Sequence, residues 1–113
     1  MVHSIKYVKA GSLKPFAGKA KSWKIKIDER YRSDKGLLEH ELVHVRQWWT
    51  KGLIIHGIRY QFSRDYRYAC EIEAYRKQLK FYNNPNIFKF AKFIMERYDL
   101  KVHLTKIIKD LGG

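Results

Sequence analysis

Several features that would define a special class of protein are scarce in this sequence. The chain contains a single cysteine, Cys70, which excludes an internal disulfide and fits a reducing cytosol. No window approaches about 18 consecutive apolar residues, so no membrane-spanning helix is expected. The N-terminus also lacks the apolar run of a signal peptide. We therefore expect a cytoplasmic protein with no membrane partner, folded as one domain over residues 1–113.

Acidic residues are also few. The sequence has 24 Lys and Arg against 11 Asp and Glu, a formal net charge of +13. This surplus suggests a nucleic-acid partner, but the basic residues are spread along the chain and form no single cluster. The densest basic and aromatic stretch, residues 59–76, is better explained as a solvated face whose tyrosines pack inward. Nucleic acid is therefore permitted but not favoured as a partner, and the positive field would favour acidic substrates.

Apolar periodicity predicts short strands followed by helices. Alternating residues predict strands over 4–9 and 22–28, with a loop over 14–21 between them. Apolar residues at spacings of three and four predict helices over 37–51, 64–82 and 86–98, and a short helix in the tail 101–113. The glycines at 52 and 57 indicate a loop after the first of these helices. The expected fold is a small, mainly helical α+β domain with a short antiparallel sheet next to the first helix.

The first predicted helix carries the run His40-Glu41-Leu42-Val43-His44. Residues four apart on a helix differ by about 40° around its axis, so both imidazoles project from one face. His40 and His44 can therefore bind one metal ion, and Glu41 reaches the same side as a base for a metal-bound water. The run predicts the helix of a zinc peptidase. The alternative interpretation is a chance match, because the pattern is short.

A catalytic zinc ion usually has three protein ligands, so a third ligand must come from elsewhere. The second predicted helix offers Glu71 and Glu73. These residues are about 200° apart around the helix axis, so they cannot both face one ion. The residues alone leave open which of them binds zinc, and also the interpretation that both are exposed partners of nearby basic side chains. Cys70 points away from Glu71 and is expected to be a buried thiol.

Two histidine ligands on one helix and a glutamate on a following helix resemble the gluzincin peptidases. The run from Glu71 to Ala74 is similar to the second gluzincin helix, in which a small residue follows the glutamate ligand by three positions. The resemblance implies that Glu71, and not Glu73, is the third zinc ligand. Many gluzincins carry an aspartate after the small residue, where it orients a histidine ligand. This chain has Tyr75 there, so a hydroxyl would have to take that role.

The short chain with a central site most resembles the minigluzincins, which are small soluble members of that group. The predicted function is a zinc-dependent endopeptidase in which Glu41 activates the water. The strand over 22–28 is expected to be an edge strand beside the cleft, where an extended polypeptide substrate would pair with it. The candidates for stabilising the oxyanion are His56, Arg59 and Tyr60. The alternative hypothesis is a basic, nucleic-acid-associated zinc protein with little or no peptidase activity.

The tail, residues 101–113, has two interpretations. Its apolar residues and Asp110 either cover the cleft or pair with another molecule, or they complete the core as an ordinary final helix. The resemblance implies the first, because minigluzincins are similar to zymogens that C-terminal segments keep latent. Self-association through the tail is therefore a further expected partner interaction.

Overall fold

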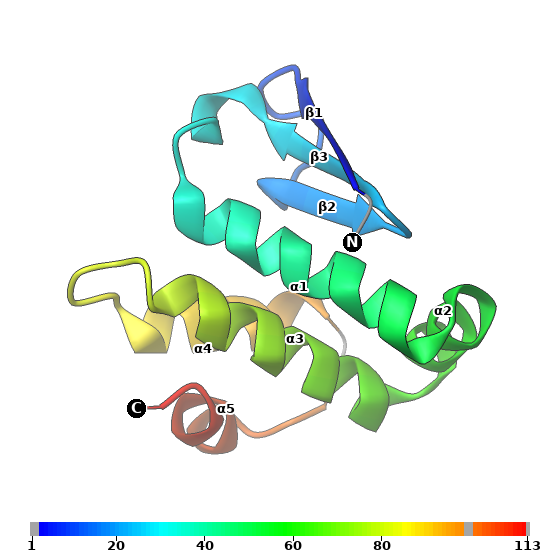
Figure 1. Cartoon of the computed structure of the whole chain (residues 1–113). Helices are drawn as coiled ribbons and strands as arrows, with labels where there is room; N and C mark the ends of the chain where they lie inside the picture. Colours follow the sequence, from blue (N-terminus) through cyan, green and yellow to red (C-terminus); the bar gives the residue numbers. More distant parts are fainter. Residues whose placement is uncertain (1–2, 99–100, 113) are drawn as a thin grey trace.

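Three strands precede five α-helices in the computed structural model, which describes residues 3–98 and 101–112 (Figure 1). The strands are β1 (Ser4–Val8), β2 (Gly18–Lys21) and β3 (Lys24–Asp28), followed by a 3-10 turn, η1 (Glu29–Tyr31). The helices are α1 (Lys35–Lys51), α2 (Leu53–Phe62), α3 (Arg64–Leu79), α4 (Ile87–Arg97) and α5 (Leu104–Asp110). The expected mainly helical α+β class is confirmed. None of the helices in these described ranges is both long and apolar enough to cross a bilayer.

The sheet is mixed, so the expected antiparallel sheet is wrong in part. The strand order is β1-β3-β2, with β1 parallel and β2 antiparallel to β3. The loop between β1 and β2 stays at one end of the sheet and crosses the end of β3. There, the Gly11 amide donates to Asp28 Oδ2 at 2.8 Å, and the Asp28 amide donates to the Ala17 carbonyl at 2.8 Å. Because of this anchoring, β2 begins at the same end of the sheet at which β1 ends. β2 therefore runs antiparallel to β3.

Strand β2 occupies the second half of the predicted loop over 14–21, so that prediction is wrong for residues 18–21. Gly18 and Ala20 have no large side chains, and the sequence therefore shows no apolar alternation. The strand forms because it pairs in a hairpin with β3, placing Gly18 opposite Ile27 and Ala20 opposite Ile25. The prediction that 22–28 is the edge strand beside the cleft is reversed as well. β3 is the central strand, β1 and β2 are the edge strands, and β2 is the one that borders the cleft.

Helix α1 is the central element of the fold and packs against one face of the sheet (Figure 1). Asp34 caps its first turn, with Oδ1 accepting from the Leu37 amide at 2.9 Å. The helix ends at Gly52, which has a φ of 90°. A first core cluster lies between β3 and α1 and contains Ile25, Ile27, Leu37 and Val45. The predicted helix over 37–51 is therefore confirmed, with its start two residues earlier.

Helix α2 occupies the region predicted to be a loop. It starts directly after Gly52 and continues through Gly57, the residue that indicated a loop. A Cβ atom on Gly57 would lie 3.0 Å from the ring of Trp48 on α1. The glycine is therefore present because α2 approaches α1 closely, and it does not mark a break in the chain.

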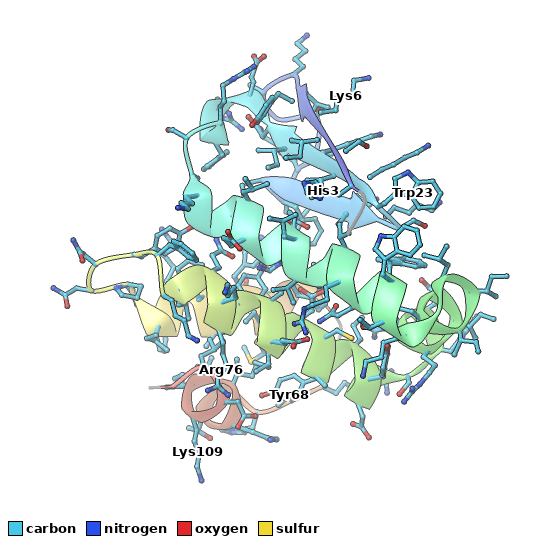
Figure 2. The ribbon with its side chains drawn as sticks, in the orientation of Figure 1. His3, Lys6, Trp23, Tyr68, Arg76 and Lys109 are labelled. Carbon is cyan, nitrogen blue, oxygen red and sulfur yellow. The ribbon has the colours of Figure 1, made fainter. Side chains whose placement is uncertain are left out.

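A second core cluster joins the last three helices. It contains Ile72, Tyr75, Leu79, Ala91, Ile94, Ile107 and Leu111. Helices α3 and α4 confirm the predicted helices over 64–82 and 86–98, and Ala91 and Ile94 point inward as expected. The tail forms α5, which Tyr68 fixes to α3 by donating to Asp110 Oδ2 at 2.5 Å. Figure 2 shows Tyr68 reaching from α3 toward α5. Gly113 of the expected tail lies outside the described residues.

Candidate metal centre

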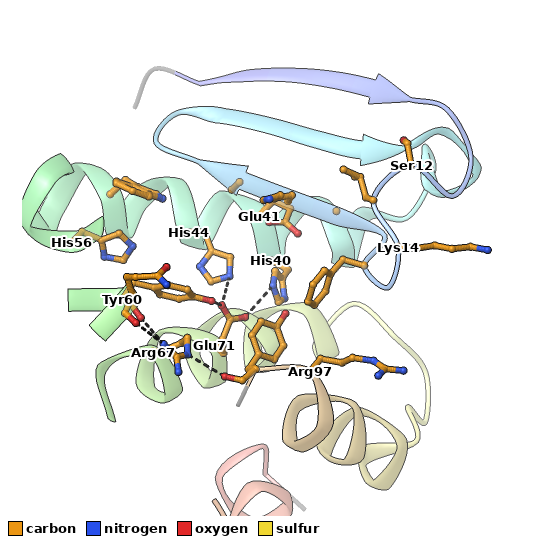
Figure 3. A pocket seen from close by; sticks show the side chains of 18 residues that line it. Ser12, Lys14, His40, Glu41, His44, His56, Tyr60, Arg67, Glu71 and Arg97 are labelled. Atoms are coloured by element: carbon orange, nitrogen blue, oxygen red, sulfur yellow. Dashed lines mark hydrogen bonds and ion pairs between the residues drawn. The ribbon is translucent and has the colours of Figure 1, made fainter. Parts of the chain in front are cut away.

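His40 and His44 from α1 and Glu71 from α3 point toward one another (Figure 3). Nε2 of His40 lies 3.7 Å from Oε1 of Glu71, and Nε2 of His44 lies 3.2 Å from Oε2 of Glu71. One candidate ligand atom from each residue lies within 4.8 Å of the other two. The three residues are 4%, 9% and 2% exposed, respectively. The structure therefore brings together the two predicted histidines and the glutamate that the family resemblance selects.

These residues fit a zinc ion in both spacing and chemistry. Nitrogen and carboxylate ligands at about 2.1 Å from a tetrahedral ion lie roughly 3.4 Å from each other, close to the spacing found here. Oε1 of Glu71 is buried and has no hydrogen-bond partner. A buried carboxylate oxygen without a donor is costly, and a cation at this point would compensate it. Two imidazoles and one carboxylate form a donor set typical of catalytic zinc.

The electrostatics of the cluster are those of a site that attracts a positive charge. Burial alone would lower the pKa of His44, but Glu71, Glu41 and Gln47 together outweigh burial and raise that pKa to about 9. Burial would raise the pKa of Glu71, but His44 outweighs it and holds that pKa at about 2. Burial and the neighbouring His44 lower the pKa of His40 to about 3. Glu71 is thus an anion in the protein interior, and His40 has a free lone pair.

Glu41 lies beside this cluster, on the side of strand β2. Its side chain is 3% exposed, and burial raises the pKa of its carboxyl to about 7. A Cβ atom on Gly18 would lie only 2.8 Å from Glu41 Oε2. Glycine at the start of β2 is therefore what allows the carboxylate to occupy this position. No pattern in the sequence predicts this contact, since residues 18 and 41 approach only through the packing of β2 on α1.

A chain of hydrogen bonds holds His44 in place. Nδ1 of His44 lies 2.9 Å from Oε1 of Gln47, and an amide oxygen only accepts, so Nδ1 donates and Nε2 faces Glu71. Gln47 Nε2 in turn donates to Glu73 Oε1 at 2.8 Å and to the Cys70 carbonyl at 3.1 Å. Arg46 donates to the other oxygen of Glu73 at 2.6 Å. Glu73 is thus not positioned as a ligand. Instead, Glu73 holds Gln47, and Gln47 orients the predicted ligand His44.

Gln47 is a functional candidate that sequence reasoning missed. Its position three residues after His44 places both on one helix face, and that spacing is the signal that would have found it. The buried free thiol expected at Cys70 is confirmed, and burial raises its pKa to about 11.

Tyr75 contacts His40 but does not hydrogen-bond to it. The two rings meet edge to face with centroids 4.3 Å apart, and the Tyr75 hydroxyl lies 3.0 Å from the Tyr98 hydroxyl. Tyr75 therefore restricts the orientation of the His40 ring by packing. Another side chain near that ring is Gln78 of α3, which opposes in part the lowering of the His40 pKa by burial and His44. Nδ1 of His40 and Oε1 of Gln78 are both buried without a hydrogen-bond partner, so a small side-chain rotation would pair them.

The cluster opens into a cleft with a volume of about 710 Å³. Its lining includes Gly18, Lys19 and Ala20 from β2, so the edge strand borders the cleft. Of the three predicted oxyanion candidates, His56 and Tyr60 line the cleft, whereas Arg59 stacks on the Tyr66 ring at 4.2 Å. The Tyr60 hydroxyl donates a hydrogen bond to Glu71 Oε2, and His56 Nδ1 lies 2.7 Å from the Tyr66 hydroxyl.

Comparisons with known proteins add no family to this picture. No protein-family model matches the sequence, and neither a curated protein nor a solved structure is significantly similar to it. The function must therefore be inferred from the geometry of the site.

Proposed function

We propose that this chain is a zinc-dependent peptidase of the gluzincin type, with His40, His44 and Glu71 as the metal ligands. The observation that carries the proposal is the convergence of these three buried side chains from two helices, next to the carboxyl group of Glu41 and at the base of a cleft. A structural zinc site is normally closed by four protein ligands. Here the neighbouring Glu41 would act as a base, and the open cleft would give access to water and substrate.

A zinc ion in this site would supply a Lewis acid that polarises the scissile carbonyl and acidifies water. Glu41 accepts the proton of the attacking water and passes it to the leaving amine, for which a carboxyl with a pKa near neutrality is suited. Tyr60 is the better of the two oxyanion candidates in the cleft. Burial and the nearby Glu71 raise its pKa, so its hydroxyl stays protonated and can donate a hydrogen bond.

The proposed substrate is a polypeptide in extended conformation. Strand β2 is the edge of the sheet and borders the cleft, so its free backbone groups are available for pairing with an extended segment. Lys14, Lys19 and Arg97 line the cleft, whereas Glu41 and Glu71 are the acidic residues in its lining. Glu41 and Glu71 are assigned to catalysis and zinc binding. The basic residues of the lining are therefore left to contact the substrate, and they favour acidic side chains.

The tail and the cellular location belong to the same proposal. The buried Ile107 and Leu111 support the interpretation that α5 completes the core, and no described residue of α5 lines the cleft. Latency would then require a tail from a second molecule, and sedimentation of the protein over a range of concentrations tests that self-association. A cytoplasmic location fits the buried free thiol of Cys70, which is typical of a reducing compartment.

The experiment that tests the function combines metal analysis with cleavage of casein-derived peptides. The wild type is expected to bind one zinc ion per chain and to cleave the peptides. Glu41→Gln should retain the zinc and lose turnover by at least about a hundredfold, since it removes only the base. Glu71→Gln should lose both the zinc and the activity. Full activity in Glu41→Gln, or zinc-free wild-type protein that still cleaves, would contradict the proposal.

A further inference from the structure

Helix α2 exposes an apolar face that no other part of the described chain covers. Its four exposed apolar residues are Ile54, Ile55, Ile58 and Phe62, with exposed fractions of 76%, 61%, 55% and 82%. Ile54, Ile58 and Phe62 follow one another at spacings of four, and Ile55 lies beside them. At about 100° per residue, all four fall within roughly 100° of the helix circumference. They form one continuous stripe, called the α2 stripe below.

The rest of α2 is packed normally. The opposite side carries His56, which is buried, and Tyr60, and both line the cleft. The stripe is therefore not a sign of a loosely placed helix. It is the outer side of a helix whose inner side is fixed in the protein. A contiguous exposed apolar surface of this kind marks an interaction site more often than a chance feature.

Aromatic residues extend the apolar character of this end of the molecule. Trp49 lies in the last turn of α1, shortly before α2 begins, and is 42% exposed. It stacks on Trp23 from the β2–β3 turn, with ring centroids 6.0 Å apart. Figure 2 shows Trp23 on the side of the molecule nearest to α2. Tryptophans half in water and half in apolar contact are typical of side chains at a bilayer interface.

The charges around the stripe select the kind of partner. No acidic residue occurs between positions 42 and 64, and this stretch contains four basic residues, Arg46, Lys51, Arg59 and Arg64. The whole chain has a net charge of +13. A second copy of the chain would bring the same positive charge to the interface and would be repelled. An anionic surface would be attracted, and a basic helix with one apolar face is the sequence type that binds it.

We propose that α2 binds the protein to the surface of an anionic lipid bilayer. The α2 stripe lies in the boundary between headgroups and acyl chains, while Lys51 and Arg59 contact lipid phosphates beside it. This binding is peripheral and needs no membrane-spanning helix. It differs from the sequence-based expectation of no membrane partner, which considered only helices that cross the bilayer. The proposal does not depend on the peptidase chemistry.

Vesicle flotation with the full chain tests the proposal. Wild-type protein should float with vesicles of equimolar phosphatidylcholine and phosphatidylglycerol, and much less with phosphatidylcholine alone. High salt should weaken the binding, because it screens the lysine and arginine contacts. Phe62→Gln should weaken binding about tenfold, since burying one such side chain corresponds to roughly that factor. Phe88→Gln on α4 is the matched control, because Phe88 is 55% exposed on another helix.

Lys51→Glu tests the charge contribution separately and should also weaken binding to the anionic vesicles. Equal binding by Phe62→Gln and Phe88→Gln would overturn the proposal, since the attraction would then be electrostatic alone. Absence of wild-type binding to the anionic vesicles would also overturn it. A dimer in sedimentation that Phe62→Gln dissociates, together with no flotation, would assign the stripe to a second copy instead. Thermal melting of each variant by circular dichroism checks that the fold is retained.

Discussion

Zinc should stabilise this protein strongly, and the effect should depend on Glu71 but not on Glu73. The two glutamates are two residues apart on α3, yet Glu71 is 2% exposed in the ligand cluster, while the Glu73 side chain is 47% exposed and pairs with Arg46. Glu71→Gln and Glu73→Gln therefore make the same chemical change on one helix, inside and outside the proposed centre. Glu73→Gln is a stringent control, because Glu73 also supports Gln47.

The magnitude follows from binding linkage and the size of the chain. A ligand that binds only the folded state contributes about 2.7 kcal/mol at a hundredfold excess over its Kd. For 113 residues, the entropy of unfolding is roughly 0.24 kcal/mol/K. Zinc at that excess should therefore raise the Tm by about 11 °C. Glu71→Gln should show a shift near zero at the same zinc concentration, and Glu73→Gln should keep most of it.

Differential scanning calorimetry with added zinc or with a chelator measures both shifts. For each variant, the readout is the difference in Tm between the sample with zinc and the sample with chelator. This difference is needed because Glu71→Gln also removes the anionic partner of His44 and changes the metal-free stability. A zinc-induced shift in Glu71→Gln as large as that of the wild type would refute the assignment of Glu71 as a ligand. Loss of the shift only in Glu73→Gln would assign the role to Glu73.

Three further substitutions test the surroundings of the site and the core. Gln47→Leu should weaken zinc binding about 10- to 100-fold in a competition assay with a fluorescent chelator, because it removes the acceptor that orients His44; unchanged affinity would show that Gln47 is dispensable. Gly18→Ala should retain zinc but lose cleavage activity by at least about tenfold, since the added methyl would displace the Glu41 carboxylate; wild-type turnover would contradict that contact. Ile107→Ala should lower the free energy of unfolding in urea by about 2–5 kcal/mol, because Ile107 is fully buried; a loss below about 1 kcal/mol would argue against α5 as part of the core.

Much of the candidate metal centre could be predicted because it depends on local helical geometry. The spacing of His40 and His44 defines a shared face on any straight helix, and the structure adds only the depth of burial. The choice between Glu71 and Glu73 does not depend on local helical geometry alone. Helical angles showed that the two diverge, but which of them faces α1 depends on how two helices pack, and only the family resemblance indicated it before the structure did.

The features that sequence reasoning missed depend on contacts between distant segments. Strand β2 has no apolar pattern of its own and forms by pairing with β3. The loop predicted at α2 is wrong because glycine destabilises helices in general, whereas Gly57 makes room here for the ring of Trp48. Glu73 holding Gln47 is a link across 26 positions in the sequence. None of these is encoded in spacing within one element, so periodicity could not reveal them.

The arrangement of the two core clusters has a consequence for how the domain opens. One cluster joins the sheet to α1, the other joins α3 to α4 and α5, and the proposed metal ligands lie on the seam between them. The seam is joined by hydrogen bonds from Gln47 to Cys70 and Glu73, but it also includes buried polar atoms without partners, so local opening of the domain should begin there. A bound ion would link the halves directly, and opening one half would then break ligand bonds. Hydrogen exchange of the amides of α1 and α3 along this seam should therefore slow down when zinc is added.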